Sequence, residues 1–144
     1  MNTPTRQIEA RAHELAEESL LGAILISPEI ITEVAKTIRP SDFRGGESSR
    51  NARIYKAMTE CEHPDQISVA RKLQELKLLV LHDCAYLRHL VSVCPMSLDY
   101  PYYVEAVLKY AVDRNSRYYL DKGEYDKAQD TLSRIKKTVY KDGI

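Results

Sequence analysis

The chain has 144 residues, a length that suits one domain, and its 44% hydrophobic and 29% charged residues exclude extensive disorder. Lysine plus arginine equals aspartate plus glutamate at 21 each, so the chain lacks the basic excess of a surface devoted to the nucleic-acid backbone. The longest apolar stretches, 20–26 and 78–81, are too short to span a bilayer, and the polar N-terminus lacks the order of a signal peptide. We therefore expect a cytoplasmic protein with no membrane partner.

The three cysteines are Cys61, Cys84 and Cys94, an odd number without a CxxC pair. Such spacing indicates neither a zinc site nor a disulfide framework. We expect reduced thiols and no bound metal.

Apolar periodicity predicts a first helix over about residues 8–25 that anchors the core. Gly22 lies inside it and costs about 1 kcal/mol relative to alanine. We interpret this glycine as a point where another helix passes close, the alternative being a glycine tolerated near a helix end. Ser27 and Pro28 resemble a capped start of a second helix that reaches Ile38 before Pro40 stops it.

The remaining part of the first hundred residues also reads as short helices. Residues 41–46 form a loop or turn, and Ser48 or Ser49 caps a helix with Ala52, Ile54, Tyr55 and Met58 facing inward. Ser68 and Asp83 are the predicted caps of two more helices. The run 78–81 is the one segment that resembles a strand, but no partner for it is evident, so we predict an all-α fold. Residues 1–98 then form a compact multi-helix head.

The last third of the chain carries two apolar seams at spacings of three and four residues, separated by Gly123. This pattern predicts a long antiparallel helical hairpin over residues 99–144, with helices at about 101–122 and 124–141. The first seam also includes Arg114. The apolar and aromatic seam residues are Val104, Val107, Ala111, Tyr118, Tyr125, Ala128, Leu132, Ile135 and Val139.

The first hairpin helix carries more apolar surface than the second helix can cover. The second helix has only one narrow apolar stripe. The surplus must pack on the head or on another subunit, and the sequence does not separate these two alternatives. The candidate subunit interface consists of Tyr103, Leu108, Tyr110, Val112 and Tyr119. The basic residues of the second helix, Arg134 among them, are explained without a ligand as cations near a helix C-terminus.

The sequence lacks the signatures of a catalytic site. There is no GxxxxGK[ST], and the run 45–49 has neither the spacing nor the lysine needed to cradle phosphates. The four histidines are scattered, without HExxH or a carboxylate pair beside a histidine. We expect no enzyme activity and no cofactor in this chain.

A second functional class rests on the aromatic residues at the start of the long helix. Tyr100, Tyr102, Tyr103 and Tyr110, with Arg114 and Arg117, are residue types that stack on single-stranded bases. The alternative is core and interface packing, which tyrosine also serves. A small single-stranded nucleic-acid-binding module is therefore the second hypothesis.

Several motifs, taken in order, resemble the N-terminal domain of bacterial replicative DNA helicases, the DnaB family. Residues 15–25 match its opening helix, Ser27-Pro28-Glu29 its acidic-proline turn, and Pro40-Ser41-Asp42-Phe43 its P-x-D-F. The match continues in order through residues 50–58, 65–73, 86–90 and 103–114. The chain departs from the family in two places. Ser49-Arg50 stands where the family usually has a histidine, and residues 82–85 stand where it usually has a pair of glycines.

The resemblance implies a helical head followed by a hairpin that pairs subunits into dimers, three of which form a hexameric collar. It implies further roles in DNA replication: recruitment of a primase or helicase loader in the primosome, and contact with DNA only through the helicase. ATP and magnesium would belong to a separate motor domain, with its linker beginning near residues 141–144. The chain is then either part of a longer ATP-dependent helicase or a stand-alone relative that modulates one.

Overall fold

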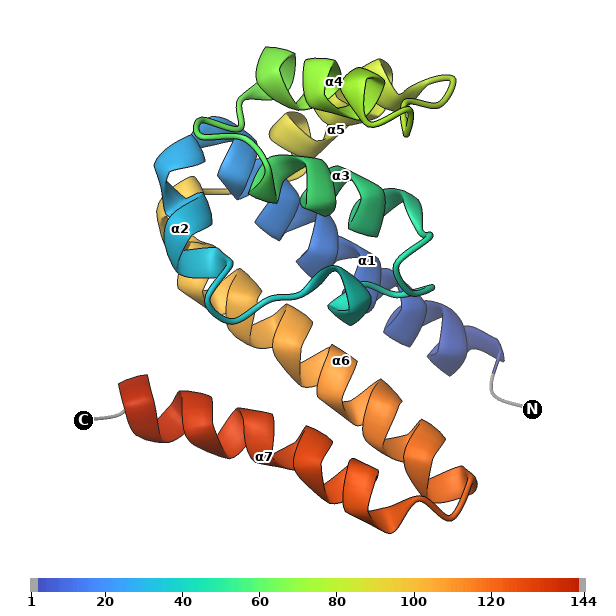
Figure 1. Cartoon of the computed structure of the whole chain (residues 1–144). Helices are drawn as coiled ribbons and strands as arrows, with labels where there is room; N and C mark the ends of the chain where they lie inside the picture. The colour runs from blue at the N-terminus through green and yellow to red at the C-terminus, as the bar shows by residue number, and fades with distance from the viewer. Residues whose placement is uncertain (1–2, 143–144) are drawn as a thin grey trace.

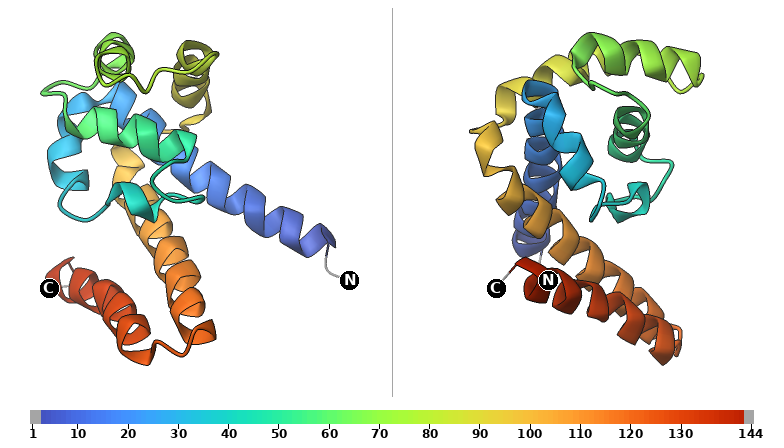
Figure 2. Two further views of the ribbon diagram at one scale, coloured as in Figure 1. Left: turned by 45° about the vertical axis from the view of Figure 1, so that its right-hand side comes forward. Right: turned by 60° about the vertical axis from the view of Figure 1, so that its left-hand side comes forward.

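The first helix, α1 (Thr3–Ile26), runs through the head, and α3, α5 and α6 pack against it. The computed structural model describes the backbone of residues 3–142 and the side chains of residues 10–135. Leu20, Leu21, Ala23 and Ile24 are fully buried because apolar residues cover every side of α1 there. The N-terminal part of α1 projects from the body of the head (Figure 2).

The segment after α1 is more broken than predicted. It forms a 3-10 turn, η1 (Pro28–Ile30), then the short helix α2 (Ile31–Val34) and a second 3-10 turn, η2 (Pro40–Asp42). The predicted cap at Ser27 is wrong, because its side chain makes no capping hydrogen bond. Ser27 Oγ donates instead to Ser97 Oγ at 2.9 Å.

Three helices complete the head. One of their three N-caps agrees with the prediction from the sequence, and two do not. Ser49 caps α3 (Arg50–Thr59) by accepting from the Ala52 amide at 3.2 Å, as predicted. Asp65, not Ser68, caps α4 (Gln66–Glu75), since its carboxylate accepts from the Ser68 amide at 2.8 Å. The N-cap of α5 (Asp83–Val93) is His82 in a left-handed conformation, so the predicted cap at Asp83 is also wrong.

Gly22 lies where α1 and α5 cross closely. A Cβ added to Gly22 would lie 2.2 Å from the Leu90 carbonyl oxygen of α5 and 2.9 Å from Cys94 Cβ. Only a glycine allows this approach. The interpretation of Gly22 as a point of close helix passage is confirmed.

The 3-10 turn η3 (Ser97–Asp99) leads into α6 (Tyr100–Asp121), and a turn at Lys122–Glu124 leads into α7 (Tyr125–Asp142). Gly123 has φ of +74°, which reverses the chain without strain. Figure 1 shows α6 descending from the head and α7 returning beside it. The predicted all-α fold, a multi-helix head followed by an antiparallel hairpin, is confirmed, and the residues described contain no strand at 78–81 or elsewhere.

The hydrophobic core is shared between the head and the hairpin. Val107, Leu108 and Val112 of α6 belong to the same buried cluster as the apolar face of α1. Each described helix is too short or too polar to cross a membrane. The side chain of Val139 and residues 143–144, where a linker was expected to begin, lie outside the described part of the chain.

Candidate assembly surface and head–hairpin junction

The predicted hairpin seam is only partly closed. Val107, Ala111 and Ala128 are buried, while Val104 and Ile135 are half-buried. The remaining described seam residues are Tyr118, Tyr125 and Leu132, with exposed fractions of 53%, 68% and 46%. Leu120, which is not a seam residue, is also exposed, at 47%.

The five candidate interface residues do not share one environment. Leu108 and Val112 are 3% and 1% exposed and are packed in the core, so the prediction that they contact another subunit is corrected. The head of the same chain covers this part of α6. Tyr103 donates from its hydroxyl to the Met96 carbonyl at 3.0 Å.

The other two tyrosines of that set also contact the same chain. Tyr110 stacks on His13 of α1 with ring centroids 4.0 Å apart. Tyr119 packs edge-on against Tyr118, with the Lys127 ammonium 5.8 Å from its ring. Their part in a subunit contact stays a prediction.

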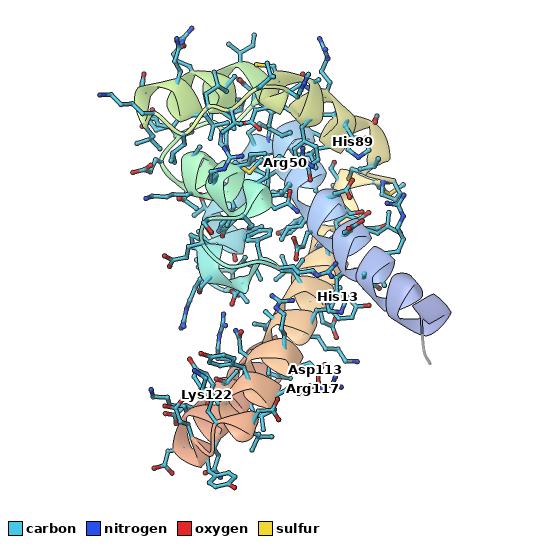
Figure 3. All side chains as sticks on the ribbon, turned by 90° about the vertical axis from the view of Figure 1, so that its right-hand side faces the viewer. His13, Arg50, His89, Asp113, Arg117 and Lys122 are labelled. Carbon is cyan, nitrogen blue, oxygen red and sulfur yellow. The ribbon has the colours of Figure 1, made fainter. Side chains whose placement is uncertain are left out.

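The tyrosine and arginine residues considered for nucleic acid do not form one open platform. Tyr102 is 71% exposed, but Tyr110 is covered by His13 and Arg114 is directed into the chain. Arg117 lies beside Asp113 on α6 (Figure 3), with Nη2 at 3.4 Å from its carboxylate. Stacking of several successive bases would need these groups on a common free face.

The junction between head and hairpin is organised around Asp42 of the P-x-D-F segment, whose side chain is 1% exposed. Its Oδ2 accepts from the Arg39 amide at 2.7 Å. Arg134 of α7 binds both carboxylate oxygens, with Nη1 at 2.7 Å from Oδ1 and Nη2 at 3.0 Å from Oδ2. The second nitrogen also donates to the Thr37 carbonyl at 2.9 Å. The interpretation of Arg134 as a cation that only complements a helix dipole is therefore wrong.

Arg114 of α6 reaches the same aspartate from the other hairpin helix. Its Nη2 donates to the Asp42 carbonyl at 2.7 Å. Burial lowers the pKa of Arg114, while the charges of Glu17 and Asp42 raise it. For Arg134 the hydrogen bond to Asp42 raises the pKa and burial lowers it. Two hairpin arginines thus bind Asp42 of the head, Arg134 at its carboxylate and Arg114 at its backbone carbonyl.

A polar hollow of about 590 Å³ lies on the head between α1, α3 and α5. Asn51 Nδ2 donates to Glu17 Oε1 at 2.9 Å, and the Arg44 amide donates to Glu17 Oε2 at 2.8 Å. The Tyr86 hydroxyl donates to Asn51 Oδ1, and burial raises the pKa of Tyr86 to about 12, so this hydroxyl keeps its proton at neutral pH. These bonds tie α1, α3 and α5 together.

The rim of the hollow carries a second set of contacts. His89 Nε2 lies 2.6 Å from Glu18 Oε1, and the Arg50 guanidinium lies 3.5 Å from the centre of the Tyr86 ring. Figure 3 shows Arg50 and His89 in the head, remote from the labelled hairpin residues. Carboxylates and arginines balance here, and no serine or cysteine nucleophile is hydrogen-bonded to a base among the lining residues. The arrangement supports cohesion between helices.

Within the described part of the chain, no three histidine, cysteine, aspartate or glutamate side chains are grouped to hold a metal ion. Two buried carboxylates have protein donors instead: that of Asp42 accepts from Arg134 and the Arg39 amide, and that of Asp83 accepts from Arg53 at 3.1 Å.

Glu17 makes the stability of the head dependent on pH. Burial raises its pKa above the ordinary 4.5, although Asn51, the Arg44 amide and Arg114 lower it. A raised carboxyl pKa means that the fold favours the protonated form, so this stabilisation is present below pH 4.5 and is lost as pH rises through the folded-state pKa. In urea titrations between about pH 4 and 7 we therefore expect the stability of Glu17→Gln to rise relative to that of the unmodified chain.

The matched control for this prediction is Glu14→Gln, because Glu14 lines the same hollow but is 48% exposed at its side chain. We expect its stability to follow that of the unmodified chain across the same pH range. A pH-independent difference for Glu17→Gln would contradict the assignment of the titrating group.

Sequence reasoning missed the pairing roles of Asp42, Arg134 and Asp83. One signal was available: Arg114 occupies an apolar seam position, and a charge at such a position requires a buried partner. The identity of that partner follows only from the return of the 37–42 segment to the hairpin, 72 residues away along the chain.

Comparison with known proteins agrees with the helical architecture. The family model described as the DnaB-like helicase N terminal domain matches residues 10–109. The solved structure of the N-terminal domain of DnaB helicase from Mycobacterium tuberculosis is 26% identical, with a TM-score of 0.66. The similarity covers 88% of this chain and 95% of that one. This chain therefore belongs to the family of DnaB-like helicase N-terminal domains.

Proposed function

We propose that this chain is a non-catalytic assembly and protein-interaction domain of a replicative DNA helicase, and that it pairs with a second copy through its hairpin. The observation that carries the pairing is the exposure of Tyr118, Leu120 and Tyr125 near the hairpin turn and of Leu132 farther along α7. Large apolar side chains gathered on an exposed element mark protein contact surfaces. Closed dimers are the commonest arrangement of identical chains, and three such dimers would complete a hexameric collar.

The pairing is tested by sedimentation equilibrium at micromolar concentrations. We expect the unmodified chain to self-associate, and Tyr125→Glu combined with Leu132→Glu to raise the dissociation constant at least tenfold. Two buried carboxylates at a contact would each lose hydration without a partner. Folding of the variant should persist because both positions are exposed.

The control is Ile67→Glu, which introduces the same charge at a position of the head that is 73% exposed. This variant should associate as the unmodified chain does. If the unmodified chain is a strict monomer, the pairing proposal is overturned. If the head and hairpin variants weaken association equally, the contact does not lie on the hairpin.

Recruitment of a primase or helicase loader is the second part of the proposal. It rests on the family and on the exposed apolar residues outside the hairpin, such as Leu81 and Leu98, at 81% and 79%. Titration of the labelled domain with the primase of the same replication system tests it. Saturable binding supports recruitment, and its absence in both the primase and the loader titrations contradicts it.

Single-stranded nucleic-acid binding, the alternative, is separated from assembly by fluorescence anisotropy. Binding through phosphate contacts weakens as salt rises. Salt-sensitive binding of labelled single-stranded DNA to the monomeric hairpin variant would favour the alternative. We expect none, because the total charge is balanced and Arg114 is engaged with Asp42.

A further inference from the structure

Among the described side chains of α7, which end at residue 135, few contact the head. At one end α7 begins beyond Gly123, whose φ is +74° and around which no atom lies within 4 Å of an added Cβ. Among the side-chain hydrogen bonds of the described residues, those that join α7 to the head all come from Arg134. Ile135 adds a half-buried contact with the core.

The acceptor side of this contact is held independently of α7. Asp42 ends the 3-10 turn η2 and accepts from the amide of Arg39, the residue that caps the start of this turn. The Asp42 carbonyl accepts from Arg114, and α6 is fixed in the core by Val107, Leu108 and Val112. The position of Asp42 therefore does not require Arg134.

Arg114 has donor capacity that its present contacts leave unused. Nη2 binds the Asp42 carbonyl, while the buried Nη1 makes no hydrogen bond to a described protein group. A guanidinium has five N–H donors in a planar fork, so Arg114 has donors in addition to the one that binds the Asp42 carbonyl. A buried carboxylate left without a cation is strongly unfavourable. A replacement cation would therefore lower the free-energy cost of separating Asp42 from Arg134.

We propose that Asp42 and Arg134 form a latch between the head and α7, and that Arg114 takes over the carboxylate when Arg134 leaves. The latch gives α7 two positions, one docked on segment 37–42 and one released about the turn at Gly123. Arg114 keeps the head intact in both. This inference concerns one chain alone and stands whether or not the hairpin pairs with a second copy.

The first test measures the position of α7 by double electron–electron resonance. Spin-labelled keto amino acids replace the exposed Thr32 of α2 and the exposed Asp130 of α7, and labelled chains are diluted into unlabelled chains so that only distances within one chain are recorded. We expect one narrow distance distribution for the otherwise unmodified chain. In Arg134→Gln a second, longer distance should appear.

Arg134→Met provides a second variant that keeps the apolar stem and removes the charge, and it should give the same longer distance. The matched control is Arg117→Gln, which removes an arginine of α6 paired with Asp113 at the surface. Its distribution should remain narrow. An unchanged distribution in a folded Arg134 variant would overturn the latch.

The second test concerns the replacement by Arg114 and uses melting temperatures followed by circular dichroism. If each arginine substitutes for the other, the decrease in Arg114→Gln combined with Arg134→Gln should exceed the sum of the two single decreases. Arg117→Gln combined with Arg134→Gln should be additive. Additivity in both pairs would overturn the takeover by Arg114 and leave Arg134 as an independent contact.

Discussion

Asp83→Ala is expected to lower the free energy of unfolding by about 3 kcal/mol, because it breaks a buried ion pair and leaves its cation uncompensated. The Asp83 side chain is 2% exposed, and its Oδ2 lies 3.1 Å from Arg53 Nη1, which is on a side chain that is 16% exposed. The same oxygen accepts from the Val80 amide at 2.9 Å. Urea denaturation followed by circular dichroism at 222 nm measures the change.

The control for Asp83 is Asp113→Ala, which removes the partner of Arg117 at side-chain exposures of 54% and 75%. Exposed pairs of this kind contribute about 0–1 kcal/mol, so its effect should fall within about 0.5 kcal/mol. Equal effects of the two substitutions would contradict the structural role of Asp83. The variant Asp83→Asn, which retains an acceptor for the Val80 amide, should lie between them.

Gly22→Ala is expected to destabilise the chain by about 1 kcal/mol, although alanine is the better helix former. The propensity gain is about 1 kcal/mol, but the added methyl group would lie 2.2 Å from the Leu90 carbonyl oxygen, and overpacking of this kind costs about 1–3 kcal/mol. The clashing atom belongs to the backbone, so α5 must move as a whole. Urea denaturation gives the size of the effect, and hydrogen exchange should show faster exchange in α5.

Gly123→Ala is the control for Gly22→Ala, because it tests the effect of backbone conformation without a steric contact. Gly123 has a positive φ but open space around it, so alanine there should cost about 1 kcal/mol through backbone strain alone. Its effect should leave hydrogen exchange in α5 unchanged. Stabilisation by Gly22→Ala would mean that helix propensity exceeds the contact with Leu90.

The parts of the fold that were predictable are those encoded by local periodicity. The helices α1, α6 and α7 each repeat their apolar positions over several turns, and the close passage at Gly22 was visible as a glycine that helix propensity disfavours. The cap at Asp65 was missed because Ser68 is an equally good capping residue type, and only the backbone geometry decides between them.

The junction could not be predicted because its partners are distant in sequence. Arg134 and Asp42 are 92 residues apart, and their contact depends on the direction in which α7 leaves the turn. The burial of Leu108 and Val112 was undecided for the same reason, since an apolar face does not specify whether the head or another chain covers it. Local pattern determines which face is apolar, and the arrangement of the whole chain determines its neighbour.

The continuity of α6 from the core to the hairpin turn makes it a mechanical lever. It is one helix of 22 residues whose buried residues run from Val107 to Ser116, and from Ser116 to Gly123 it rises about 10 Å at 1.5 Å per residue. A tilt of about 10° at the last buried residue would therefore move the turn by about 2 Å. Repacking inside the head would thus be passed along α6 to the far end of the hairpin.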